Sequence, residues 1–355
     1  MKALTKIAIG MGTLALSFGA LAEVRIQGAG STFVAPMMQR WVTEYQKVDP
    51  AARIDYQSIG SGGGIKAFLE KTVDFGASDA PLGKKEFAAA GGTDAVIQIP
   101  VVAGAVVPGY NLPGLNGELK LDGPVLADIF QGKIKKWNDP RIVAMNPGLA
   151  LPGIAILPVH RTDGSGTTFV FTSYLSTQSE TFKEEIGASK QVEWPNGGAG
   201  GKGNEGVTQV VEAAPGAVGY IELAYALQNK VAFASMKNKD GHFIKASPAS
   251  TSAAGEAASK MMDANNAVAL WNQPGPEVYP IAGLVYVFVR HDLSYLKDDA
   301  KAKALASFLA WAIHDGQKMA SGLDYAPLSD AVQKRASESL AKITLSGTPI
   351  LKASN

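Results

Sequence analysis

The chain has 355 residues, of which 46% are hydrophobic and 18% charged, and its formal net charge is +1. This is the composition of an ordinary globular protein, and the length is sufficient for two domains. The absence of cysteine excludes disulfides, thiolate metal sites and a lipid carried on a cysteine.

The first 22 residues have the pattern of a secretory signal peptide. Lys2 and Lys6 precede a short apolar run, and small residues at 20–22 form a cleavage site before Glu23. No later apolar run is long enough for a membrane helix, and no basic stripe suggests nucleic-acid binding. Loss of the leader changes the formal charge from +1 to −1. We therefore expect an exported protein of the Gram-negative periplasm that does not span the membrane.

Two glycine-rich segments near the start of the mature chain each connect a strand-like run to a helical pattern. Residues 28–33, Gly-Ala-Gly-Ser-Thr-Phe, place Ser31 and Thr32 at a helix N-terminus. Residues 59–64 repeat this arrangement, with Ser61 at the start of the second helix. A helix N-terminus leaves backbone N–H groups unpaired and carries partial positive charge, so both junctions favour anions.

Asp79 stands at the end of the next strand-like run, residues 73–77. It is interpretable as a helix cap or as a solvated loop residue. Near anion-binding loops a carboxylate is unfavourable unless the anion carries a proton, because a protonated oxyanion needs an acceptor. Asp79 is thus a candidate for selecting protonated over fully ionised anions.

Residues 161–169, Arg-Thr-Asp-Gly-Ser-Gly-Thr-Thr-Phe, form the central motif of the chain. They join a strand-like run to an apolar helical run, so Ser165 and Thr167 are expected at a helix N-terminus. Arg161 adds a planar fork of donors that matches tetrahedral oxyanions. The motif predicts an anion cradle, although simple helix capping with a surface Arg161–Asp163 ion pair fits the same residues. It is not a Walker loop.

The rest of the chain alternates strand and helix patterns. The apolar run at 96–107 is long enough to cross between two lobes, and 284–289 is a strong strand. The glycine-rich residues 196–206 fit a flexible surface turn or a further anion loop, with Lys202 left out of the site. Residues 237–258 are polar and are expected to form a loop-bearing surface. The alternation predicts α/β layers with a mainly parallel sheet.

The motifs together resemble the family of periplasmic phosphate-binding proteins of bacterial ABC phosphate uptake systems. The resemblance covers the mature chain in order and rests on residues 28–33, 59–64, 74–81, 132–137, 163–167 and 215–220. It implies an α/β, two-lobed periplasmic binding protein fold of the type II kind, with a ligand cleft between lobes joined by a hinge. Lobe I would comprise residues 23–102 and 278–355, and lobe II residues 103–277.

The resemblance also implies the site and its partners. The phosphate-binding residues would be Thr32, Phe33, Ser61, Asp79, Arg161, Ser165, Gly166 and Thr167. Asp163 would support Arg161 by pairing with it, and Asp79 would accept a proton from phosphate. The partners would be inorganic phosphate and the permease subunits of an ABC importer, and the protein would be a monomer with no cofactor, no metal and no enzymatic activity.

Two other functions remain compatible with the residues. A secreted phosphatase or phosphotransferase could use the same cradle, but Ser61 and Ser165 lack the Gly-x-Ser-x-Gly elbow. The four histidines are widely separated and lack metal-ligand spacing. Alternatively, the protein could bind sulfate or another oxyanion, and Asp79 is the residue that distinguishes this possibility from phosphate binding.

Overall fold

The computed structural model describes residues 23–195 and 198–351, so the predicted signal peptide, residues 1–22, lies outside the described residues. The strands are β1 (Val24–Gly30), β2 (Ala52–Ser58), β3 (Phe75–Ser78), β4 (Val96–Tyr110), β5 (Lys120–Leu121), β6 (Leu157–Arg161), β7 (Ala199–Gly201), β8 (Ala217–Glu222), β9 (Ala232–Phe233), β10 (Ser235–Lys237), β11 (Phe243–Ile244), β12 (Ala282–Arg290), β13 (Thr344–Leu345) and β14 (Thr348–Pro349). The α-helices are α1 (Ala35–Val48), α2 (Ser61–Leu69), α3 (Lys84–Ala89), α4 (Gly123–Phe130), α5 (Pro140–Met145), α6 (Gly166–Gln178), α7 (Glu180–Glu185), α8 (Gly203–Ala213), α9 (Leu223–Gln228), α10 (Pro248–Ala258), α11 (Asp299–Ile313) and α12 (Asp330–Leu340). The 3₁₀ helices are η1 (Thr93–Ala95), η2 (Ser259–Met261), η3 (Leu293–Leu296), η4 (Asp315–Met319) and η5 (Ser321–Leu323).

One large sheet runs through the molecule in the order β2–β1–β3–β12–β4–β8–β6–β7, and β9 also pairs with β4. At one end β1 is parallel to β2 and β3, and at the other β6 is parallel to β7 and β8. Between them, β12 and β4 are antiparallel to each other and to their outer neighbours. The expectation of a mainly parallel sheet is therefore wrong for the centre of the sheet. β12 returns from late in the chain, and the local pattern of a buried strand does not reveal its direction.

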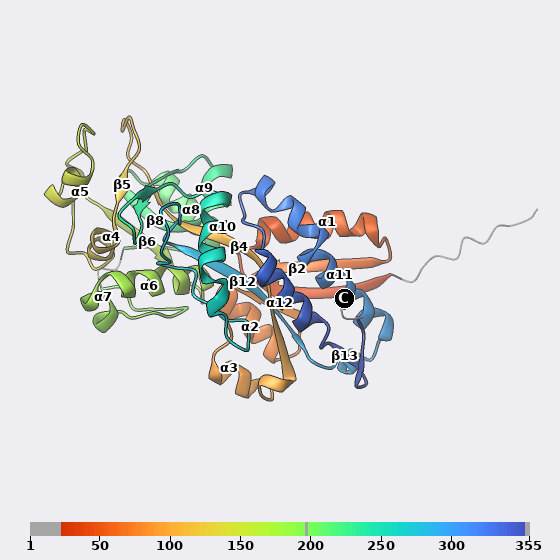
Figure 1. Ribbon diagram of the computed structural model, residues 1–355. Coiled ribbons are helices and arrows are strands. Elements are labelled where there is room, and N and C mark those ends of the chain that lie inside the picture. The colour runs from red at the N-terminus through yellow and green to blue at the C-terminus, as the bar shows by residue number, and fades with distance from the viewer. Residues whose placement is uncertain (1–22, 196–197, 352–355) are drawn as a thin grey trace, which may run out of the picture.

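Strand β4 joins the two ends of the sheet. Its residues 96–105 pair with β12, whereas residues 106–110 pair with β8. Every residue of β4 is buried, which explains the almost continuous apolar run in its sequence. Figure 1 shows the first and last parts of the chain, red and blue, on one side of these strands and the green middle part on the other. We call β1–β3, α1–α3, α11 and α12 the terminal group, and β6–β8 with α4–α9 the middle group.

Helices α1, α2 and α6 begin at the predicted glycine-rich entrances. One face of α1 buries Met37, Met38, Trp41 and Tyr45, as its apolar spacing predicts. Helix α6 is instead buried over most of its surface. Among the described residues, no helix combines the length and apolarity that a membrane span requires.

Two segments differ from what the sequence pattern predicts. The glycine-rich residues 196–206, expected to form a turn or a loop, contain strand β7 and the start of helix α8 at Gly203. The polar residues 237–258 contain helix α10, whose N-terminus is capped by Ser247. Helix α10 was missed because its buried apolar residues are alanines, which produce little apolar periodicity.

Candidate functional site

The N-termini of three helices carry most of the residues predicted to bind the anion. Thr32 and Phe33 precede α1, Ser61 is the first residue of α2, and Gly166 and Thr167 begin α6. All five residues are buried. Within residues 23–195 and 198–351, no acceptor pairs with their backbone N–H groups. Buried N–H groups without a protein acceptor are suited to an anion, which supplies only acceptors.

Arg161, the last residue of β6, brings a positive charge to these N-termini. Its Nε and Nη2 donate to the two carboxylate oxygens of Asp163 at 2.7 and 2.6 Å, and its Nη1 donates to Thr167 Oγ1 at 3.3 Å. Burial acts to raise the pKa of Asp163, but the hydrogen bonds and charge of Arg161 outweigh it and hold that pKa below its ordinary value. The expected pairing is present. Because the two charges offset each other, Arg161 supplies directed donors without a strong net positive field.

Asp79 follows β3 and is only 3% exposed. Its carboxylate accepts hydrogen bonds from Ser31 Oγ and, at 3.3 Å, from Thr167 Oγ1. Burial raises the pKa of Asp79 to about 6, against the lowering effect of these hydrogen bonds and of Arg161. A Cβ atom at Gly166 would lie 2.5 Å from Asp79 Oδ2, so only glycine permits this close approach. Asp79 is therefore a buried acceptor among donors.

The hydroxyl groups of Ser61 and Ser165 both accept hydrogen bonds from the backbone. Ser61 Oγ accepts from the N–H of Asp79 at 3.4 Å. Ser165 is the N-cap of α6, and its Oγ accepts from the N–H of Thr168 at 3.0 Å. The capping interpretation of Ser165 is thus correct as local structure, and it leaves the hydroxyl hydrogen available to a ligand.

Two residues that the sequence analysis did not place in the site lie within it. Ser31 donates to Asp79, and Asn204 donates from Nδ2 to Thr32 Oγ1 at 2.8 Å and to Thr167 Oγ1 at 3.2 Å. Ser31 adjoins Thr32 in a motif already recognised, so its position could have suggested it. Asn204 belongs to the glycine-rich segment 196–206, which had two open interpretations, and lies in the first turn of α8. Its residue type gives no local signal.

Direct contacts connect the terminal and middle groups around the site. The N–H of Gly62 donates to the carbonyl of Gly164 at 2.8 Å. At the rim, Lys190 Nζ and Glu86 Oε1 form an ion pair at 2.6 Å. Lys202 is exposed, which agrees with its omission from the predicted site. All the predicted site residues are thus brought together where the two groups meet.

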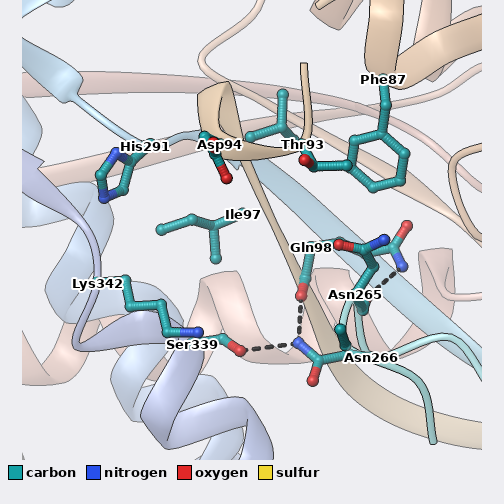
Figure 2. Close-up of a pocket in the computed structure, with 12 residues that line it drawn as sticks. Phe87, Thr93, Asp94, Ile97, Gln98, Asn265, Asn266, His291, Ser339 and Lys342 are labelled. Atoms are coloured by element: carbon teal, nitrogen blue, oxygen red, sulfur yellow. Dashed lines mark hydrogen bonds between the residues drawn. The ribbon is translucent and has the colours of Figure 1, made fainter. Parts of the chain in front are cut away.

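A cavity of about 460 Å³ lies elsewhere and is lined by α3, η1, β4, α12 and residues 264–266. Its lining contains none of the predicted site residues, and the Gln98 and Asn266 side chains form hydrogen bonds with other residues of the lining (Figure 2). Asn266 Nδ2 donates to the carbonyl of Gln98 at 2.7 Å and to Ser339 Oγ at 2.8 Å. Gln98 Nε2 donates to the carbonyl of Asn265 at 2.8 Å. These bonds tie the segment after η2 to β4 and α12, so they have a structural role.

The arrangement of donors and one acceptor suits a tetrahedral oxyanion that carries a proton. Backbone N–H groups, hydroxyl groups and a guanidinium can surround its oxygens, and Asp79 can accept the proton. Among the described residues, no group of three or more His, Cys, Asp or Glu side chains is placed to hold a metal ion.

The chain is similar to proteins of known family. A family model described as a PBP superfamily domain matches residues 19–315. The chain is 44% identical over 316 residues to the phosphate-binding protein PstS of Xylella fastidiosa (strain 9a5c), covering 88% of this chain and 84% of that protein. It is 42% identical over 331 residues to the phosphate-binding protein PstS of Pasteurella multocida (strain Pm70), covering 93% and 94%.

The fold is also similar to that of a solved structure. The putative phosphate ABC transporter substrate-binding protein of Clostridium perfringens, solved with bound phosphate, is 18% identical to this chain and has a TM-score of 0.62. The similarity covers 86% of this chain and 100% of that one. The α/β, two-lobed binding-protein fold expected from the sequence is confirmed.

Proposed function

The chain belongs to the PBP superfamily and, within it, to the family of PstS phosphate-binding proteins, and we propose that it captures inorganic phosphate for an ABC importer. One observation carries the proposal beyond family membership. Backbone N–H groups with no acceptor among the described residues lie at three helix N-termini, and Arg161 and the buried carboxylate of Asp79 contact residues of these termini. Donors suit the oxygens of phosphate, and the carboxylate suits the proton that phosphate retains near neutral pH.

The proposed ligands are the eight residues predicted from the sequence. Backbone N–H groups would come from Thr32, Phe33, Ser61, Gly166 and Thr167, hydroxyl donors from Thr32, Ser61 and Ser165, and a guanidinium from Arg161. The Thr167 hydroxyl donates to Asp79, so Thr167 would bind phosphate through its backbone N–H. Sulfate is fully ionised near neutral pH and has no proton for Asp79, so it would meet an uncompensated negative charge. We therefore propose phosphate rather than sulfate as the ligand.

The ligand would be held between two lobes. We propose lobe I as residues 23–102 and 278–355 and lobe II as residues 103–277. The change of pairing partner within β4, from β12 to β8, supports a hinge there. Because phosphate would contact both lobes, binding would favour the closed form, and the importer would respond to that closure.

The proposed setting is the periplasm, reached by export through the leader at residues 1–22. The PstS relatives are named as binding proteins, and we propose the same role here, without turnover of phosphate compounds. The working unit would be a monomer that delivers phosphate to the permease subunits of the importer.

Equilibrium dialysis of the mature protein against radiolabelled phosphate tests the proposal. Before the assay, bound phosphate is removed by unfolding, dialysis and refolding. We expect saturable binding of one phosphate per chain and no release of phosphate from aryl phosphates, with or without added divalent metal. Absence of binding would contradict the proposed ligand, and metal-stimulated hydrolysis would favour the phosphatase alternative.

A further inference from the structure

Asn204 is a buried amide between the two proposed lobes, behind the hydroxyl groups of the site. It is the second residue of α8 and has 0% exposure. Its Oδ1 accepts a hydrogen bond from the backbone N–H of Glu222 at 2.9 Å. Because a backbone N–H can only donate, this contact determines which way the amide faces, and Nδ2 must point to the other side.

On that other side, Asn204 Nδ2 donates to two threonine hydroxyl groups. It lies 2.8 Å from Thr32 Oγ1 and 3.2 Å from Thr167 Oγ1. The backbone N–H of Asn204 also donates to Thr32 Oγ1, at 3.1 Å. Thr32 precedes α1 in the terminal group, whereas Asn204 and Thr167 begin helices of the middle group. One side chain thus connects both groups at the site.

These bonds determine what each hydroxyl group can do. A hydroxyl oxygen has two lone pairs and one hydrogen. Both lone pairs of Thr32 Oγ1 are used by Asn204, so its hydrogen can only be donated, and no described residue accepts it. Thr167 Oγ1 likewise accepts from Asn204 and from Arg161 Nη1, and it donates its hydrogen to Asp79.

We propose that Asn204 is a positioning residue that makes the Thr32 and Thr167 hydroxyl groups obligate donors and ties Thr32 to lobe II. This inference rests on the proposed phosphate site and adds to it a source of specificity. A phosphate oxygen that carries no proton can only accept, so a preset donor at Thr32 binds it without first reorienting. If the Thr32 hydroxyl hydrogen were donated to another acceptor instead, that hydrogen bond would have to break before the hydroxyl could donate to phosphate.

A double-mutant cycle tests whether Asn204 acts through Thr32. We expect Asn204→Ala to weaken phosphate binding about 10-fold to 100-fold, the effect of losing two or three hydrogen bonds around the site. In a Thr32→Val background no hydroxyl remains to be oriented. There the fold-loss of phosphate affinity caused by Asn204→Ala should be at least about threefold smaller, because the effects of coupled residues are not additive. Equal losses in both backgrounds would overturn the proposal.

Asn146 offers a matched control for general destabilisation. It is also a buried asparagine of the proposed lobe II, 4% exposed, and its side chain bonds to the backbone of Lys120 and Ile142 away from the site. Asn146→Ala should lower the melting temperature of the ligand-free protein but leave the phosphate dissociation constant unchanged. If Asn146→Ala and Asn204→Ala weaken phosphate binding equally, Asn204 has only a structural role.

A second substitution covers the case in which Asn204→Ala does not fold. Asn204→Asp keeps the shape and the acceptor for the Glu222 N–H, but the oxygen that replaces Nδ2 can only accept. The Thr32 hydroxyl hydrogen would then turn toward this new carboxylate oxygen in place of phosphate, and binding should weaken at least about 10-fold. Unchanged affinity would overturn the proposal. Failure of the wild-type protein to bind phosphate would instead refute the proposed function itself.

Discussion

Replacing Asp79 with asparagine keeps the shape of the side chain but removes its negative charge and turns one of its two acceptor oxygens into a donor. Asp79 is 3% exposed and receives hydrogen bonds from Ser31 and Thr167, so its carboxylate is fixed within the site. A hydrogen bond to a charged group contributes about 1.5–3 kcal/mol, which corresponds to about a 10-fold to 100-fold change in affinity. We expect Asp79→Asn to weaken phosphate binding by this factor and to strengthen sulfate binding, because repulsion is removed.

The assay is calorimetric titration of each variant with phosphate and with sulfate, reported as the ratio of the two dissociation constants. Asp74→Asn is the matched control. Asp74 is also a buried carboxylate of the terminal group, 6% exposed, but it pairs with Lys301 at 2.8 Å and accepts from the N–H of Gln27 at 2.7 Å. Asp74→Asn should lower the free energy of unfolding and leave the ratio of the phosphate and sulfate dissociation constants unchanged. An unchanged ratio in Asp79→Asn, or an equal change in both variants, would refute the selectivity argument.

Three further predictions concern the same residues. Arg161→Ala should weaken phosphate binding by about 2–5 kcal/mol in titrations, because it leaves the partly buried Asp163 without its partner beside the ligand; unchanged affinity would place Arg161 outside the site. Gly166→Ala puts a Cβ atom 2.5 Å from Asp79 Oδ2 and 2.6 Å from Ser61 Oγ. We expect the resulting overpacking to weaken phosphate binding by about 1–3 kcal/mol. Wild-type affinity would contradict the close packing of Gly166 against Asp79 and Ser61. Burial raises the pKa of Asp79 to about 6, so the folded, ligand-free protein binds more protons than the unfolded chain between about pH 4 and 6. Its free energy of unfolding should therefore fall, relative to Asp79→Asn, as the pH rises through this window; a pH-independent difference in melting curves would refute this.

The sequence was most informative where chemistry and local structure coincide. Glycine followed by Ser or Thr before an apolar helical pattern indicated the starts of α1, α2 and α6, because capping residues and close backbone approach are local requirements. Arg161 and Asp163 are two residues apart, so their pairing was also predictable from sequence. Asp79 was identified by a chemical argument about protonated anions, not by its neighbours along the chain.

Long-range geometry could not be derived in the same way. Asn204 reaches Thr32, 172 residues earlier, and neither an asparagine nor a glycine-rich loop reveals which distant side chain it will contact. The antiparallel direction of β12 depends on where the chain returns to the sheet, which its apolar run does not encode. Helix α10 lacked a strong apolar stripe, although Ser247 followed by Pro248, an N-cap residue with proline in the first turn, was a usable start signal.

We propose that this site binds phosphate and excludes fully ionised oxyanions. The most direct test is calorimetric titration of the ligand-free, wild-type mature protein with phosphate, alone and with excess sulfate present. We predict binding of one phosphate per chain with an affinity that sulfate does not change. Sulfate that competes on equal terms would contradict the role of Asp79, and the absence of phosphate binding would contradict the account as a whole.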